Sequence, residues 1–326
     1  MERTRELTYV QALNEALRAE MQKNESIFIM GEDIRKWGGA FAVSYSLFKE
    51  FGPNRVRDTP ISEAAFMGAA TGAAIMGLRP VVELMFNDFM GVCWDQIFNQ
   101  AAKLRYMTGG QVKIPLVIIT NYGGGVSAAS HHSQSLYTLF AHCPGIKVAV
   151  PSTPRDGKGL LTSALRDENP VILFSHKLMF GMKGQVPEGQ YSIDFGEAEV
   201  KKPGNDITVV AIGYMVHVAL EASKKLAEKR INIEVIDPRT LVPFDKEAVF
   251  NSLKKTGKLI ILDESYRRSG YSAEIASMMA EEGFDLLDAP IKRVTGPNTP
   301  IPFSPELERY VLPSEEKLIK AAEEMA

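Results

Sequence analysis

The chain has 326 residues, of which 45% are hydrophobic and 24% charged, and its net charge at pH 7 is −3. These values are ordinary for a soluble globular protein of about two domains, and they exclude the basic surface that nucleic acids or anionic membranes would need. Cys93 and Cys143 are too few for a disulfide framework and match no metal-ligand spacing. The charged start MERTRELTYV contains no apolar run, so we expect no secretory signal and a cytoplasmic location.

The first half of the chain alternates predicted strands and helices. Thr8 and Gln11 have the spacing of a capping box, and apolar residues then recur at helical spacing as far as Met21. The stretch from Trp37 to Pro60 is rich in Gly, Pro and charge, which predicts a long surface loop. Further apolar runs predict strands at residues 26–33, 81–85, 115–120, 147–154 and 170–176 and a helix at 156–166.

The run from Ala64 to Leu78 is dense in Ala and Gly, which is typical of a helix that packs very closely on its neighbours. Gly68 and Gly72 have the spacing of a membrane dimer motif. The uncharged run is nevertheless shorter than the ~20 residues that span a bilayer. We therefore predict a closely packed helix in a protein without a membrane segment.

The second half repeats the same alternation. Residues 206–240 predict a strand–helix–strand unit, and KLIILDES with the helix after it extends that unit. The alternation indicates an α/β fold with largely parallel sheets. The predicted domains are 1–190 and 205–326, joined by a linker at 191–204.

Glu63 is the first candidate site residue, because it opens the small-residue helix. A glutamate in the first turn of a helix often only complements the helix dipole. Its apolar neighbours Ile61, Phe66 and Met67 also make burial plausible, and a buried carboxylate needs a partner such as a ligand nitrogen. The spacing leaves both interpretations open.

His131 and His132 end a Gly-rich loop after a predicted strand. Adjacent histidines are no obvious metal pair, so a proton-transfer role and an exposed, capping role remain equally open. The run Gly123–Gly125 matches neither nucleotide-binding motif. Met85 and Phe89 fit core packing on pattern alone, and the acid pairs 32–33 and 263–264 end predicted strands, where salt bridges or helix caps are open alternatives. Spacing alone does not name a reaction.

Several longer segments along the chain belong together: IMGED, FGPNRVRDTPISEAAFMGAA, GLRPVVELMFNDF, DQIFNQAAKLRYMTGG, HHSQSLYTLFAHCPGIKVAVPSTP, EVIDPRTLVPFD and PFSPELERYVLPS. In this order they resemble one family over nearly the whole chain, the β subunits of thiamine-diphosphate-dependent 2-oxo acid dehydrogenase complexes. Among its members, the chain is most similar to acetoin dehydrogenase, with the pyruvate and branched-chain 2-oxo acid enzymes as alternatives.

The resemblance implies a transketolase-like fold, in which a pyrimidine-binding α/β domain precedes a C-terminal α/β domain. Glu63 aligns with the family glutamate that hydrogen-bonds the cofactor's aminopyrimidine ring, and Met85 and Phe89 align with residues that pack around that ring. His132 aligns with a histidine implicated in proton transfer during acyl transfer to a lipoyl group.

The resemblance also implies a site for a monovalent cation such as K⁺. The family binds this ion through main-chain oxygens, which leave little signature in the sequence. The matching residues are Leu116, Ala164, Leu165, Asp167 and Asn169.

One family feature is missing from this chain. Enzymes of this class hold the cofactor's diphosphate through Mg²⁺ bound by a GDG…N segment, and no GDG occurs here. We therefore expect an α subunit to supply the diphosphate and metal ligands, in an assembly of two α and two β chains that passes acyl units to a dihydrolipoyl acyltransferase core.

Three residues depart from the family pattern. His131 stands where relatives usually have Gln, Ile119 where they have Arg, and Ser175 where Glu is common. Two of these positions lie near the expected site, so a non-catalytic assembly module is a minor alternative. Glu63 and His132 are both present, which favours a catalytic subunit.

Overall fold

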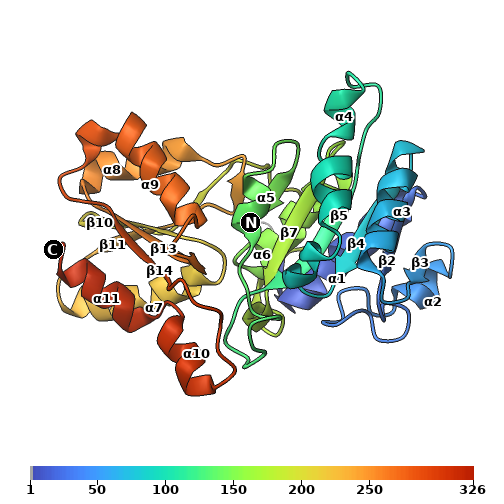
Figure 1. Ribbon diagram of the computed structural model, residues 1–326. Coiled ribbons are helices and arrows are strands. Elements are labelled where there is room, and N and C mark those ends of the chain that lie inside the picture. The colour runs from blue at the N-terminus through green and yellow to red at the C-terminus, as the bar shows by residue number, and fades with distance from the viewer. Residues whose placement is uncertain (1–2) are drawn as a thin grey trace. The chain divides into compact units, whose positions relative to one another are not determined.

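The chain forms two α/β units in the computed structural model, which describes residues 3–326 (Figure 1). The first unit takes in the chain up to Tyr122 and again Leu139–Phe195. The second comprises Gly123–Thr138 and Gly196–Ala326. The Gly-rich loop with the two histidines therefore belongs to the second unit, although strands of the first unit flank it in the sequence.

Six strands of the first unit form a parallel sheet in the order β6-β7-β5-β4-β2-β3. Their near-continuous burial is typical of parallel strands covered on both faces. The strands are β2 Ile27–Gly31, β3 Val56–Asp58, β4 Arg79–Leu84, β5 Val117–Tyr122, β6 Lys147–Ala149 and β7 Val171–His176. The helical elements are α1 Tyr9–Lys23, α2 Leu47–Phe51, α3 Glu63–Ile75, η1 Asn87–Gly91, η2 Gln96–Ala101, α4 Leu104–Met107, α5 Tyr137–Ala141, α6 Pro154–Arg166 and η3 Lys177–Met179.

The start of the chain is fixed to this unit by an antiparallel pair, β1 (Thr4–Thr8) with β8 (Lys183–Pro187). The predicted capping box is confirmed: the Thr8 hydroxyl accepts from the Gln11 amide, and the Gln11 side chain accepts from the Thr8 amide. Such a cap stabilises a helix by about 1 kcal/mol. It therefore sets where α1 begins.

Two local predictions needed correction. The stretch from Trp37 to Pro60 is not one loop, because it contains the short helix α2 and the edge strand β3. Strand β3 pairs with β2 over only three residues, which local patterning does not reveal. The small-residue helix does not extend over the whole run to Leu78, because it ends at Ile75. Gly77, with its positive φ of 91°, then turns the chain into β4.

The second unit contains a five-stranded sheet in the order β14-β13-β10-β11-β9, in which only β9 is antiparallel. Helices α8 and α9 cover one face, and α7 and α11 cover the other (Figure 1). The strands of this sheet are β9 Glu199–Lys202, β10 Ile207–Ala211, β11 Ile233–Asp237, β13 Leu259–Tyr266 and β14 Lys292–Gly296, and the unit also contains β12 Thr240–Val242, which is not part of the sheet. The helical elements are α7 Met215–Glu228, α8 Lys246–Thr256, α9 Tyr271–Glu282, η4 Phe284–Leu286, α10 Pro305–Val311 and α11 Glu315–Glu323.

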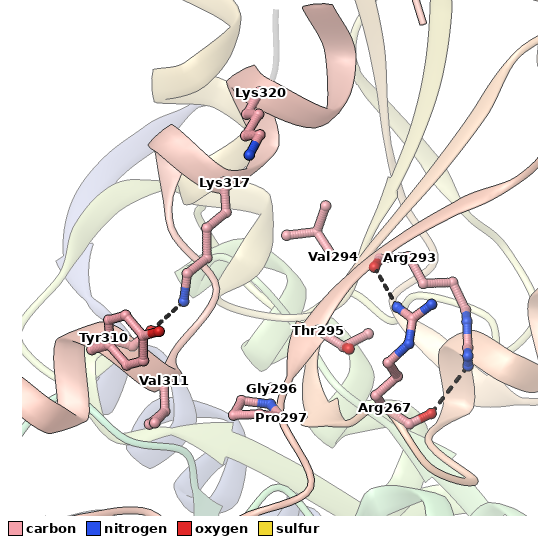
Figure 2. A pocket seen from close by; sticks show the side chains of 10 residues that line it. All are labelled: Arg267, Arg293, Val294, Thr295, Gly296, Pro297, Tyr310, Val311, Lys317 and Lys320. Atoms are coloured by element: carbon pink, nitrogen blue, oxygen red, sulfur yellow. Dashed lines mark hydrogen bonds between the residues drawn. The ribbon is translucent and has the colours of Figure 1, made fainter. Parts of the chain in front are cut away.

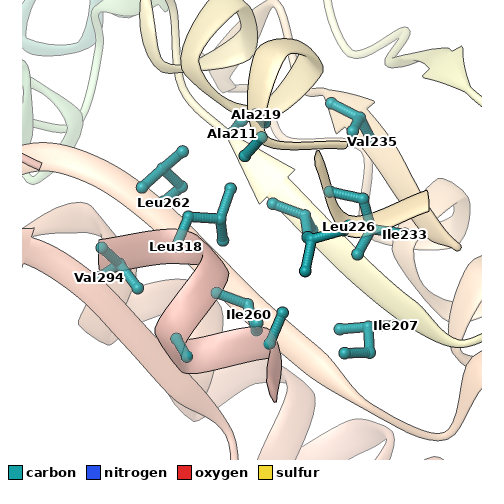
Figure 3. Close-up of a cluster of buried hydrophobic side chains, with 14 of the residues drawn as sticks. Ile207, Ala211, Ala219, Leu226, Ile233, Val235, Ile260, Leu262, Val294 and Leu318 are labelled. Atoms are coloured by element: carbon teal, nitrogen blue, oxygen red, sulfur yellow. The ribbon is translucent and has the colours of Figure 1, made fainter. Parts of the chain in front are cut away.

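The core of this unit lies between the sheet and helices α7 and α11 (Figure 3). Val209 and Leu262 from the strands pack there with Leu226 of α7 and Leu318 of α11, all fully buried. Fully burying such a side chain contributes roughly 1.5–3 kcal/mol. This core holds β13 and β14 in place, and both strands carry residues that are important below.

The chain passes from the first to the second unit between Phe195 and Gly196, within the stretch 191–204 that the sequence predicts as a linker. Part of this stretch is ordered, because β9 pairs with β11. Across residues 3–326, none of the helices is both long enough and apolar enough to cross a membrane.

Candidate functional site

Glu63 lies at the first turn of α3, where the chain enters a buried environment. The residue is only 8% exposed. Its charge helps to raise the pKa of Glu32, although burial is the larger cause. Burial first, and then the charge of Glu63, raises the pKa of Cys93 to about 12. Within residues 3–326, Glu63 forms no ion pair, so its carboxylate is suited to accept a hydrogen bond from a ligand.

Met85 and Phe89 follow strand β4 and are both half-buried. The carbonyl oxygen of Met85 accepts a 2.7 Å hydrogen bond from the Asn121 side chain. The Phe89 ring packs edge-on against Phe86, with centroids 5.8 Å apart. The Cys93 thiol donates to the Phe89 carbonyl at 3.7 Å. Cys93 thus contacts Phe89 and lies close to Glu63, so the structure brings two of the predicted cofactor residues to one place.

Another buried acid of this unit is Glu83, near the end of β4, which local patterning does not single out. The residue is 3% exposed, and burial raises the pKa of its carboxyl to about 8. The Ala40 amide and the Ser44 hydroxyl lie near it and offset part of this effect. Gly39 has a φ of 84°, and a Cβ there would overlap the Glu83 carboxyl. The acid in the otherwise apolar run VVELMF was the only available signal.

We expect the stability of the protein to fall as the pH rises from about 4.5 to 8 because of Glu83. In this range the folded carboxyl keeps its proton while the unfolded one has lost it, so deprotonation favours unfolding. Glu83→Gln should remove this part of the pH dependence. Urea unfolding at several pH values would measure it, with the exposed Glu25→Gln as control. An unchanged profile in Glu83→Gln would contradict the assignment.

Two glutamates of the second unit hold the backbone of the loop that carries His131 and His132 through hydrogen bonds. The Gly124 amide donates to Glu264 at 2.7 Å, and the Gly125 and Ser127 amides donate to the two oxygens of Glu308 at 2.8 and 2.9 Å. Glu308 is 2% exposed. These carboxylates occupy the amides that could otherwise bind an anion, so this Gly-rich run is closed to a diphosphate.

Asp263, next to Glu264 on β13, fastens the end of the same loop. It accepts a hydrogen bond from the Tyr137 hydroxyl and another, at 3.0 Å, from the Ser272 amide in the first turn of α9. The helix-capping alternative is therefore confirmed for Asp263. At the loop itself, His131 is exposed and His132 is half-buried, with its amide donating to the Ala129 carbonyl at 3.4 Å.

The residues predicted for a monovalent cation lie in the first unit, but four of their five carbonyl oxygens already have partners. The Leu116 carbonyl accepts from the Val171 amide, and the Ala164 carbonyl accepts from the Asp167 amide. The Leu165 and Asp167 carbonyls accept from the Arg79 guanidinium, at 3.1 and 2.5 Å. The Asn169 amide donates to the Asp167 side chain. A carbonyl oxygen has two lone pairs, so each of these oxygens could still bind a cation beside its present partner. The cation site therefore remains a prediction.

The three departures from the family pattern have different surroundings. Ile119 is buried in β5, and the Ser175 hydroxyl exchanges a 2.9 Å hydrogen bond with the Tyr9 hydroxyl in the core. His131 is exposed on its loop. Of the three, only His131 presents its side chain to solvent.

Comparisons with known proteins fit both units. Residues 5–182 match the family described as transketolase, pyrimidine binding domain, and residues 196–318 match transketolase, C-terminal domain. The chain is 50% identical to the acetoin:2,6-dichlorophenolindophenol oxidoreductase subunit beta of Bacillus subtilis (strain 168), over 96% of this chain and 95% of that protein. It is 41% identical to the 2-oxoisovalerate dehydrogenase subunit beta of the same organism, over 98% of both chains.

The fold also has a counterpart among solved structures. A split-gene transketolase, described as an inactive β4 tetramer, superposes with a TM-score of 0.79 at 25% identity and covers 98% of both chains. The likeness extends over both units of the chain, as do the two family matches.

Proposed function

Because the chain belongs to the family of β subunits of thiamine-diphosphate-dependent 2-oxo acid and acetoin dehydrogenases, we propose that it is the β subunit of an acetoin dehydrogenase. The higher identity to the acetoin enzyme, 50% against 41% for the 2-oxoisovalerate enzyme, favours acetoin as substrate. The reaction breaks the bond between the carbonyl and carbinol carbons, releases acetaldehyde and passes the acetyl unit to a lipoyl disulfide, which is reduced.

The observation that carries this proposal is the buried Glu63 carboxylate, whose charge acts on Cys93, a residue that itself contacts Phe89. When bound, thiamine diphosphate supplies the ring that stabilises negative charge on the substrate carbon. Glu63 would accept a hydrogen bond from the ring nitrogen N1′, with Met85 and Phe89 packing on the pyrimidine. Burial keeps this hydrogen bond strong, because water does not compete for it.

His132 would handle the proton in acyl transfer to the lipoyl group. The hydrogen bonds from the loop amides to Glu264 and Glu308 support this role, because they fix the backbone of the loop on which His132 lies. A proton-transfer group must be held within hydrogen-bond reach of its target. His132 itself is half-buried, so a substrate can reach it.

We further propose that an α subunit supplies the diphosphate and Mg²⁺ ligands, in an assembly of two α and two β chains that serves a dihydrolipoyl acyltransferase core. The chain lacks a GDG segment, and the amides of its Gly-rich loop are occupied by Glu264 and Glu308. Within residues 3–326, no three His, Cys, Asp or Glu side chains are grouped as metal ligands. A K⁺ ion at the carbonyls of Leu165 and Asp167 would have to share them with Arg79.

Co-expression of the chain with its α subunit tests the substrate. With 2,6-dichlorophenolindophenol as electron acceptor, we expect kcat/KM to be higher for acetoin than for pyruvate or the branched-chain 2-oxo acids. A higher kcat/KM for any 2-oxo acid would contradict the acetoin assignment and leave the family membership intact. The β chain alone should show no turnover.

A further inference from the structure

A basic pocket lies within the second unit, between the ends of β13 and β14 and the helices α10 and α11 (Figure 2). Its volume is about 470 Å³. Four cationic side chains line it: Arg267 after β13, Arg293 on β14, and Lys317 and Lys320 on α11. Among residues 3–326, no acidic residue lines it. We name it the basic pocket.

The two arginines hold each other in place. Nη1 of Arg267 donates to the Arg293 carbonyl, and Nη1 of Arg293 donates to the Arg267 carbonyl, both at 3.1 Å (Figure 2). A guanidinium group has five N–H donors, so most donors of each arginine stay available for a ligand. The reciprocal bonds also fix two positive charges close together, which is unfavourable unless an anion lies nearby.

The lysines differ in what they already bind. Lys317 donates to the carbonyls of Tyr310 and Leu312, so it also closes the end of α10. Lys320 is exposed, and its side chain has no hydrogen bond or ion pair within residues 3–326. Over that same range, none of the four cations pairs with a carboxylate at ion-pair distance. The positive potential of such a pocket attracts anions from solution.

The electrostatics of the basic pocket agree with this picture. Burial and then the charge of Arg267 lower the pKa of Arg293, and Asp263 offsets only part of that. Burial also lowers the pKa of Lys317, with Glu316 acting in the opposite direction. A bound anion would raise the pKa values of both Arg293 and Lys317, because a nearby negative charge favours their charged forms.

We propose that the basic pocket binds a small polyanion that carries phosphate groups. Its volume lies within the ~300–1,000 Å³ range of small-molecule sites. The planar guanidinium groups match the geometry of phosphate oxygens, and the lysines add point charges beside them. Such a site goes beyond the assigned reaction, which involves no phosphorylated substrate, and it would let a phosphorylated metabolite act on the subunit.

Calorimetric titration of inorganic pyrophosphate into the purified full-length β chain tests the proposal. Without the α subunit, its proposed diphosphate ligands do not contribute. We expect one pyrophosphate per chain, and about tenfold weaker binding in Lys320→Gln through loss of one charged contact. Arg267→Gln combined with Lys320→Gln should weaken binding about 100-fold. Lys254→Gln on α8, an exposed lysine outside the pocket, is the matched control and should bind like the wild type.

Several results would overturn the proposal. These are no binding by the wild-type chain, unchanged binding in the double variant, or equal binding of citrate, which would show a polycarboxylate site. Tighter binding of a poly-glutamate peptide than of pyrophosphate would show a surface for an acidic protein segment instead. Circular dichroism checks folding, and the exposed single variant Lys320→Gln decides the matter if the double variant fails to fold.

Discussion

Glu63→Gln is expected to lower the turnover of the assembled α–β enzyme by about 10²- to 10⁴-fold, the range typical of lost acid–base assistance. Glutamine has nearly the same shape, but its neutral amide is a much weaker acceptor for the ring nitrogen than a carboxylate. Initial rates of dye reduction at saturating acetoin and cofactor would measure the loss. Turnover within twofold of the wild type would show that Glu63 does not activate the cofactor.

The same substitution should leave the fold intact, which separates a functional loss from a structural one. After burial, the charge of Glu63 is the next cause that raises the pKa of Glu32, so the two carboxylates disfavour each other's charged forms. Removing the Glu63 charge should therefore not reduce the free energy of unfolding. Urea unfolding of the β chain checks this, and the exposed Glu25→Gln should leave both turnover and stability unchanged.

Glu308→Gln is expected to loosen the loop that carries His132. A glutamine can still accept from the Gly125 amide, but its NH₂ group would then face the donor of Ser127. One part-buried amide would lose its acceptor, at a cost of at most about 1–3 kcal/mol, and Glu308→Ala would leave two amides without one. We expect the free energy of unfolding to fall in this order, and hydrogen exchange at residues 125–127 to accelerate.

The matched control for this prediction lies on the same helix. Glu306 on α10 is exposed, and Glu306→Gln should change neither stability nor exchange. If His132 acts in acyl transfer, Glu308→Gln should slow transfer to lipoyl groups more than it slows dye reduction. Equal slowing of both reactions would assign Glu308 a purely structural role. Unchanged hydrogen exchange at residues 125–127 would show that Glu308 does not hold the loop.

Local sequence patterns predicted the elements that depend on neighbours along the chain. The capping box at Thr8, the parallel strands and the helix that begins at Glu63 all have signals within a few residues. Strand β3 and strand β9 were missed because each is short and is defined by pairing with a distant strand. The two-unit α/β architecture followed from the alternation of strands and helices.

The residues of the candidate site were likewise predicted only in part from the sequence. The resemblance pointed to Glu63, Met85, Phe89 and His132, but no pattern linked the Gly-rich loop to Glu308, which lies 183 residues from Gly125. The raised pKa of Glu83 depends on burial by side chains from other segments, so the sequence could not reveal it. Contacts of this kind are set by tertiary structure.

Titration of thiamine diphosphate with Mg²⁺ tests most directly the claim that this chain supplies only part of a shared site. Calorimetry would compare the β chain alone, the α–β complex, and the complex with Glu63→Gln. We predict no tight, Mg²⁺-dependent binding to the β chain alone and stoichiometric, Mg²⁺-dependent binding to the complex. Tight, Mg²⁺-dependent binding by the β chain alone would contradict the account.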